Sequence, residues 1–341
     1  MNTSQTLYKL RTSESSKSQS IDSIFWFNFT FTESDLVNDK QCDISNCLID
    51  KQILNRLKNE IGNFYNVGSK NNPWNSVSSN VYPYKMCISN KKISRAYYKL
   101  KEVITQVKKK DLLTFSNSNV LCLCEAPGGF VEYLTEEEKS TVMAVSLGEN
   151  IDFSYKLFPN RKCKLLYKNI LTDNISLGSY SIITADGGID SSSNYDLQEI
   201  DNSPLIIKEI EVACKHLNTD GIFIIKAFDI YLLISFRIII WLSKLFKEIS
   251  ICKPPSSKPT NSEKYIICKG YCGRDSAVSF DNVKLKENFI PNKLIEITLF
   301  STQLQINNIK KVLSELYIPT STNWGIIHRE NYNIYNKIFK S

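Results

Sequence analysis

The chain has 341 residues, of which 42% are hydrophobic and 23% are charged, a composition typical of a globular protein with a buried core and not of a fibrous or disordered chain. The net charge of +7 suits a polyanionic partner but is too small to indicate one by itself. The N-terminal sequence MNTSQTLYKL is polar and lacks the apolar segment of a secretion signal, so we expect a soluble, intracellular protein whose ten cysteines are reduced thiols.

The first ninety residues divide into two parts by composition. Residues 1–20 are rich in Ser, Thr, Lys and Gln, and we expect a flexible tail. Residues 21–90 contain recurring aromatic residues between Asn, Pro and Ser, which indicates an ordered N-terminal extension. Residues 91–110 then carry eight Lys or Arg against one Glu, with apolar residues at helical spacing, and predict a basic amphipathic helix.

An α/β fold follows from the pattern of the next 160 residues, in which short apolar runs alternate with helical stretches. The predicted strands lie at 119–126, 141–147, 162–169, 180–188, 220–228, 247–254 and 264–271. The first five should be parallel, and the last two should form an antiparallel hairpin because the loop between them is too short for a crossover helix. The apolar run at 228–246 is interrupted by Asp229, Arg237 and Lys244, so it predicts a buried helix and not a membrane span.

A glycine pair follows the first of these strands in VLCLCEAPGGFVEYL, at the carboxyl edge where open α/β sheets bind ligands. Gly128 and Gly129 allow close approach of a ligand to the backbone, and the next helix offers unpaired N–H groups. The segment lacks the G-x-G-x-x-G spacing of a dinucleotide site, which disfavours a nicotinamide dehydrogenase. Cys42/Cys47 and Cys268/Cys272 lack the C-x2-C spacing of a zinc site, so no metal is expected.

Five motifs in order, SRAYYKL, LCEAPGGF, ITADGG, FIIKAFD and KPPSSKPTNSEKYIICKG, resemble the FtsJ-type RNA ribose 2′-O-methyltransferases. Within that family they look closest to the cap-specific mRNA branch of eukaryotes and large DNA viruses. The resemblance implies a Rossmann-like S-adenosylmethionine-dependent methyltransferase domain over residues 91–275, with a mostly parallel seven-stranded sheet ending in the antiparallel hairpin. Residues 276–341 would then be a C-terminal extension.

The family's Lys-Asp-Lys-Glu tetrad maps onto Lys99, Asp186, Lys226 and Glu263. The resemblance implies that Lys226 is the base that removes the 2′-hydroxyl proton and that Asp186 orients it. Lys99 and Glu263 would set the local charge and hold the ribose. Because a lysine is almost entirely protonated near neutral pH, we expect the site to lower the pKa of Lys226.

The resemblance also implies where the cofactor, S-adenosyl-L-methionine, is held. An acidic residue expected after the third strand, on the adenine edge, is replaced by Asn169, and Asp173 is the other candidate for that contact. The remaining expected cofactor contacts form the turn after the first strand: Cys124, Glu125, Ala126, Pro127, Gly128, Gly129 and Phe130.

The expected partner is capped mRNA or another RNA, tracked by the basic helix, with aromatic residues of 21–90 or Trp324 available to hold the cap guanine. Other capping enzymes and RNA polymerase are further candidate partners, and neither DNA nor a membrane is expected. Two alternatives stay open: a ribosomal RNA 2′-O-methyltransferase of the same family, and a non-catalytic RNA-binding subunit with a degenerate methyltransferase fold.

Overall fold

The computed structural model describes residues 4–11, 22–36, 45–65, 73–74, 77–78, 92–110, 115–148, 162–189, 191, 197–274, 278–285, 290–317, 333 and 336. Its parallel strands are β3 (Asn119–Leu123), β4 (Thr141–Ser146), β5 (Cys163–Tyr167), β6 (Tyr180–Ala185) and β7 (Leu217–Ala227). The last two predicted strands, β8 (Phe246–Cys252) and β9 (Lys264–Tyr271), form the expected antiparallel hairpin, and β9 also pairs antiparallel with β7. The predicted fold class is therefore confirmed.

Two further strands extend the sheet to nine, in the order β1-β2-β8-β9-β7-β6-β3-β4-β5. β2 (Asp22–Phe31) pairs with β8, and β1 (Ser4–Arg11) pairs with β2, both antiparallel. The stretch 1–20, expected to be a flexible tail, thus contains a strand. The pairing depends on a distant sheet edge, whose unpaired backbone groups are satisfied by an added strand, so local composition does not reveal it.

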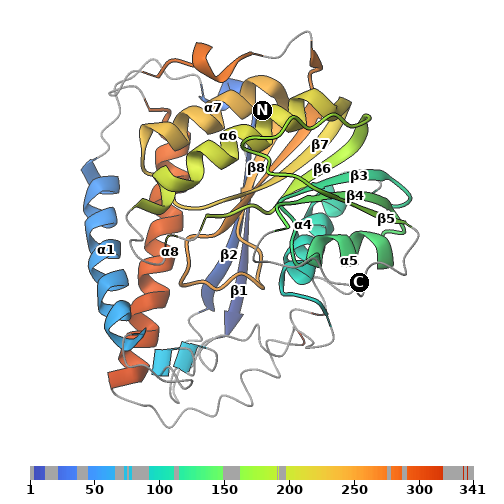
Figure 1. The fold of residues 1–341 in the computed structure, drawn as a ribbon. Coiled ribbons are helices and arrows are strands. Elements are labelled where there is room, and N and C mark those ends of the chain that lie inside the picture. The colour runs from blue at the N-terminus through green and yellow to red at the C-terminus, as the bar shows by residue number, and fades with distance from the viewer. Residues whose placement is uncertain are drawn as a thin grey trace.

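Helices cover both faces of the sheet, as Figure 1 shows. α4 (Ala96–Lys110) and α5 (Gly129–Glu136) pack on one face, and α6 (Gln198–His216) and α7 (Leu233–Leu245) on the other. The alternation along β3 explains both cores: Leu121 and Leu123 belong to the α6/α7 side, whereas Val120 and Cys122 belong to the α4/α5 side.

The two flanks of the chain meet beside this sheet. α1 (Ser45–Tyr65) and α8 (Asn292–Tyr317) lie side by side at one edge of the molecule (Figure 1), and the Tyr317 hydroxyl donates a hydrogen bond to Glu60 Oε1 at 2.8 Å. Two short 3₁₀ turns complete the described structure, η1 (Glu33–Leu36) and η5 (Phe280–Asn282). Segments before and after the predicted methyltransferase domain therefore pack on each other.

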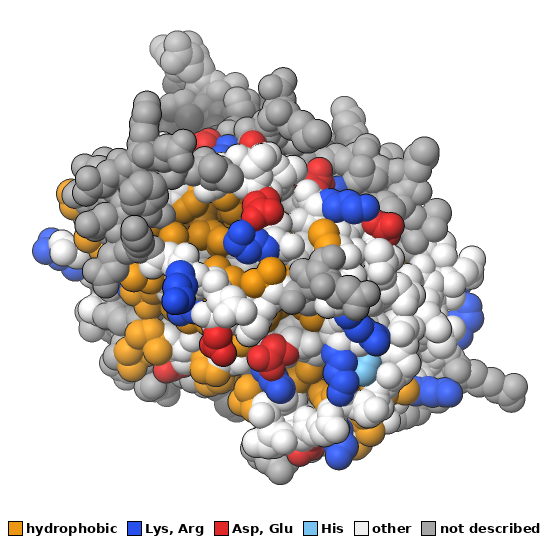
Figure 2. All heavy atoms as spheres, turned by 90° about the horizontal axis from the view of Figure 1, so that it is seen from above, with side chains coloured by type: hydrophobic (Ala, Val, Ile, Leu, Met, Phe, Trp, Pro, Cys, Tyr) orange, Lys and Arg blue, Asp and Glu red, His pale blue; other side chains and the backbone are white. Residues whose placement is uncertain are grey.

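The apolar run that ends near residue 246 forms α7, whose Phe236, Ile239 and Leu242 are buried, as predicted. Within the described part of the chain, no helix is long and apolar enough to cross a membrane. On the face seen in Figure 2, Lys and Arg side chains are intermixed with Asp and Glu around hydrophobic side chains, so the described part of this face is not uniformly basic.

Candidate functional site

The four tetrad residues come from four different elements that meet at the carboxyl ends of the parallel strands. Lys99 lies on α4, Asp186 follows β6 directly, Lys226 is the penultimate residue of β7, and Glu263 immediately precedes β9. β7 and β9 pair antiparallel there, with Lys226 opposite Tyr265. The hairpin register therefore brings Glu263 towards the end of β7.

The four side chains form two neighbouring ion pairs. Lys226 Nζ donates a hydrogen bond to the backbone oxygen of Asp186 at 2.6 Å and lies 3.3 Å from its Oδ1. Lys99 Nζ donates to Glu263 Oε2 at 2.8 Å. Each side chain is only 12–15% exposed, so both ion pairs are largely shielded from solvent.

Tyr265 fixes the orientation of the Asp186 carboxylate. Its hydroxyl donates a hydrogen bond to Asp186 Oδ1 at 2.8 Å, and the side chain is fully buried. The sequence alone does not single out this residue, because an aromatic residue inside an apolar strand is most often core packing. Its position two residues after Glu263 in the motif SEKY was the available signal.

Burial and the neighbouring charges determine the protonation of the site. Burial alone would raise the pKa of Glu263, but Lys99, Lys226 and Lys253 lower it to about 2, so Glu263 is ionised. Burial likewise pulls down the pKa of Lys226, but the carboxylates of Asp186, Glu263 and Glu209 together raise it above its ordinary value. Without the cofactor the pKa of Lys226 is therefore raised, because carboxylates surround this lysine, and a lowered pKa in the presence of the sulfonium charge stays a prediction.

A buried lysine holds the loop between β8 and β9 in place. Lys253 Nζ donates hydrogen bonds to Asn261 Oδ1 at 2.8 Å, to the Asn261 backbone oxygen at 2.9 Å and to the Glu263 backbone oxygen at 2.8 Å, and it lies 3.2 Å from Ser257 Oγ. Burial and the charge of Lys264 lower its pKa well below the usual range. Lys253 therefore sets the path of the chain that delivers Glu263.

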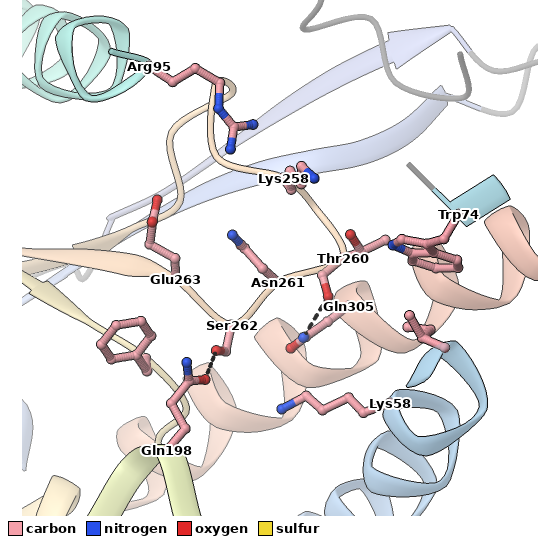
Figure 3. A pocket seen from close by; sticks show the side chains of 12 residues that line it. Lys58, Trp74, Arg95, Gln198, Lys258, Thr260, Asn261, Ser262, Glu263 and Gln305 are labelled. Atoms are coloured by element: carbon pink, nitrogen blue, oxygen red, sulfur yellow. Dashed lines mark hydrogen bonds between the residues drawn. The ribbon is translucent and has the colours of Figure 1, made fainter. Parts of the chain in front are cut away.

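Three helices also hold this loop. Glu102 of α4 accepts hydrogen bonds at Oε2 from the Ser256 N–H and hydroxyl, at 2.8 and 2.9 Å. Gln305 of α8 donates to the Thr260 backbone oxygen, and the Ser262 hydroxyl donates to Gln198 of α6 (Figure 3). The segment that resembles the family motif is thus tied to both faces of the sheet and to the C-terminal flank.

The turn after β3, where the cofactor contacts are expected, is built around two glycines and a buried carboxylate. Gly128 adopts φ 109°, a left-handed conformation that favours glycine. A Cβ on Gly129 would stand 2.2 Å from Ser94 Oγ, so this glycine serves the packing of α5 against the start of α4. Glu125 Oε1 accepts the Phe130 N–H at 2.7 Å, whereas its buried Oε2 has no partner among the described residues.

The two candidate adenine contacts lie together in the loop after β5. Asn169 Oδ1 accepts the Leu171 N–H and Asp173 Oδ2 accepts the Asn169 N–H, both at 3.0 Å, so these oxygens shape the turn. Leu147 directly follows β4 and is 50% exposed, and Tyr167 is the last residue of β5 and is 53% exposed. Both side chains leave apolar surface exposed at the carboxyl edge of the sheet.

A pocket of about 300 Å³ adjoins the tetrad (Figure 3). Glu263 lines one part of it, and Trp74, from the aromatic N-terminal flank, lines another. Its walls come from the β8–β9 loop, α1, α6 and α8 and from residues next to α4 and β7. Besides these two residues, the lining contributes an aromatic ring, three cationic side chains and three amides: Phe228, Lys58, Arg95, Lys258, Gln198, Asn261 and Gln305.

Comparison with known proteins links this geometry to a family. The model of the FtsJ-like methyltransferases matches residues 93–271. The cap-specific mRNA (nucleoside-2′-O-)-methyltransferase 1 of Mus musculus is 26% identical over 231 residues, which cover 60% of this chain and 25% of that protein. The enzyme of the same name from Drosophila melanogaster is 38% identical over 85 residues, covering 25% of this chain and 11% of that protein. The chain thus spans about a quarter or less of the length of these relatives.

Among solved structures, one described as a ribosomal RNA methyltransferase from Plasmodium falciparum superposes with a TM-score of 0.43 at 20% identity, covering 53% of this chain and 99% of that one. A superposition of this quality has no weight in assigning a function. The family match covers about half of the chain and includes all four tetrad residues. The chain belongs to the FtsJ-like methyltransferase family.

Proposed function

We propose that this chain transfers the methyl group of S-adenosylmethionine to a ribose 2′-hydroxyl of RNA, at the nucleotide beside an mRNA cap. The observation that carries the proposal is the convergence of Lys99, Asp186, Lys226 and Glu263 in two adjacent ion pairs. They lie at the sheet edge where α/β proteins bind ligands, next to a pocket large enough for a nucleoside.

Lys226 is the base that accepts the 2′-hydroxyl proton at Nζ. Its contacts with the Asp186 backbone oxygen and carboxylate restrict the direction of Nζ, and the Tyr265 hydrogen bond restricts Asp186 in turn. Lys99 and Glu263 are positioned to hold the ribose hydroxyls by donating and accepting hydrogen bonds. Positioning of this kind supplies much of the rate in a transfer between two bound groups.

Lys226 must be an amine at the moment of proton transfer, although the surrounding carboxylates favour its ammonium form. When bound, S-adenosylmethionine supplies the methyl group and a sulfonium charge, and a nearby positive charge lowers the pKa of a lysine. The cofactor would be held by the turn 124–130 and the exposed Leu147 and Tyr167, and either Asn169 or Asp173 would meet the adenine edge.

The pocket beside Glu263 supports an RNA substrate with a terminal cap. Phe228 is a partly exposed aromatic ring in this pocket, and stacking of a base against an aromatic ring contributes about 1–3 kcal/mol. Trp74 is only 3% exposed and forms part of the pocket wall. Arg95 and Lys258 supply positive charge in the same pocket, and the pKa of Lys258 is lowered by burial and by Arg95. An anion such as a phosphate would relieve the repulsion between these two cations.

The test is methyl transfer from labelled cofactor to matched capped and uncapped short RNAs, followed by nuclease mapping of the label. We expect the capped RNA to react about tenfold faster or more, which corresponds to about 1.4 kcal/mol of transition-state binding. Trp74→Ala should lower the rate of transfer to capped RNA more than the rate of transfer to uncapped RNA, so that the ratio of the two rates falls. Equal rates on both RNAs at every salt concentration would contradict the cap assignment and leave general RNA 2′-O-methyl transfer as the function.

A further inference from the structure

The short segment that follows Lys226 is tied to the N-terminal flank of the chain. Phe228 and Asp229 directly follow β7, whose penultimate residue is Lys226. Lys58 Nζ of α1 donates a hydrogen bond to Asp229 Oδ2 at 2.8 Å, and the two side chains are only 11% and 9% exposed. The ion-pair partner of Asp229 therefore comes from a helix outside the part of the chain that matches the family.

Two further helices hold the residues that come next. The N–H groups of Tyr231 and Leu232 donate to Glu199 Oε1 of α6, both at 2.8 Å. Thr298 Oγ1 of α8 donates to the Ile230 backbone oxygen at 3.0 Å. Residues 230–232 are thus held by α6 and α8, whereas α1 holds the residue directly beside Phe228.

Phe228 joins the tetrad to the pocket. The residue lines the pocket together with Glu263, and Lys226 Nζ lies 5.8 Å from the centroid of its ring. Phe228 Cζ and Lys226 Nζ each lie 3.3 Å from the point where a Cβ would stand on Gly188. A shift of this ring would therefore change a part of the pocket wall that lies next to the proposed base.

Asp229 depends on the cation from α1. Burial alone would raise its pKa, but the charges of Lys58 and Lys264 lower it, so Asp229 is ionised. Lys264 Nζ already donates to the backbone oxygens of Phe228 and Ser262, at 3.2 and 2.9 Å. A buried carboxylate that loses its hydrogen-bonded cation is costly, so without Lys58 we expect this segment to shift until Asp229 meets water.

We propose that Lys58 is a positioning residue for RNA binding, which fixes, through Asp229, the ring of Phe228 on which a base of the RNA stacks. The inference rests on the proposed function, because it takes RNA as the occupant of the pocket. Lys58 extends from α1 into this pocket (Figure 3), but its charge is paired with Asp229, so it acts on the RNA through Phe228. The N-terminal flank is then part of the substrate site.

The experiment measures the affinity of a labelled, capped short RNA by fluorescence anisotropy in the presence of S-adenosylhomocysteine. The proteins compared are the wild type, Lys58→Met, Phe228→Ala and the double variant. Arg56→Met is the matched control, because Arg56 is exposed on the same helix and its replacement changes the net charge equally. The affinity for S-adenosylmethionine is measured on every protein.

We expect Phe228→Ala to weaken RNA binding about tenfold and Lys58→Met about fivefold. Because Lys58 acts through Phe228, the double variant should bind at most about twofold more weakly than Phe228→Ala. Lys58→Arg, which keeps the cation, and Arg56→Met should bind within about twofold of the wild type. The affinity for S-adenosylmethionine should be unchanged throughout.

Equal RNA affinity of Lys58→Met and the wild type would overturn the inference. Losses that multiply in the double variant would do the same, because they indicate a direct contact of Lys58 with the RNA, and a parallel loss of cofactor affinity would indicate a structural role only. If Lys58→Met does not fold, Lys58→Met/Asp229→Asn replaces it with the same expected result, because this variant has no unpaired buried charge.

The binding measurement also separates this inference from the proposed function. A wild-type protein that binds the RNA more tightly than Lys58→Met but transfers no methyl group would refute the proposed function alone. Methyl transfer by the wild type together with unchanged RNA binding by Lys58→Met would refute only the role of Lys58. A wild-type protein that binds no RNA would overturn both.

Discussion

Replacing Lys253 by methionine should lower the free energy of unfolding more than the same replacement of any other lysine on the surface or in a loop. The substitution keeps the length of the side chain but leaves Asn261 Oδ1 and the backbone oxygens of Asn261 and Glu263 without their donor. Disruption of a buried, hydrogen-bonded charge typically costs about 3–5 kcal/mol. We expect the lower end, about 3 kcal/mol, because the groups left without a donor are neutral oxygens and not a partner charge.

The assay is urea unfolding of Lys253→Met beside Lys247→Met, whose parent side chain is 65% exposed and is paired only with Asp220 among the described residues. The control should unfold at the wild-type urea concentration, since an exposed ion pair contributes little. Methyl transfer by Lys253→Met should also fall at least about tenfold, because the loop no longer fixes Glu263. Unfolding of Lys253→Met at the wild-type midpoint would refute the role given to this lysine.

Tyr265→Phe removes the hydrogen bond to Asp186 and should lower kcat/KM about tenfold with unchanged cofactor affinity, and an unchanged kcat/KM would contradict this. The lowered pKa of Glu263 stabilises the folded protein above the unfolded-state pKa of 4.5, and this stabilisation is lost as the pH falls through about 2. The free energy of unfolding of the wild type should therefore fall by up to about 3 kcal/mol over this pH range, and that of Glu263→Gln should not show this fall. Gly187→Ala should unfold at a lower temperature than Gly178→Ala, because a Cβ on Gly187 would collide with its neighbours whereas a Cβ on Gly178 would have no atom within 4 Å. Equal melting temperatures would count against the packing described around Gly187.

The strands could be predicted because their signals are local, whereas the tetrad was expected from the resemblance of five motifs to a family. Each parallel strand is a short apolar run closed by a polar or glycine residue, and Asp186 and Lys226 mark two of those ends. Sequence order then places both at one edge of the sheet. The hairpin was predictable from the length of the loop alone, and its register brings Glu263 to Lys99.

Features that depend on distant parts of the chain were not predictable. β1 forms only because β2 extends the edge of β8, and the packing of α1 on α8 joins segments more than 200 residues apart. Glu209 lies in a helix containing other charged residues, so the sequence does not distinguish it from a solvated side chain. The three carboxylates that raise the pKa of Lys226 come from separate elements, so their convergence on this lysine could not be predicted either.

The most direct test of the account is nucleoside analysis of capped RNA after incubation with S-adenosylmethionine and either the wild-type protein or Lys226→Ala, with cofactor binding measured on both proteins. We predict a 2′-O-methylated cap-proximal nucleoside with the wild type, and its loss with Lys226→Ala while cofactor binding remains measurable. A methyl group on a base, or the same yield of 2′-O-methyl nucleoside from both proteins, would contradict the assignment of Lys226 as the base for ribose methylation.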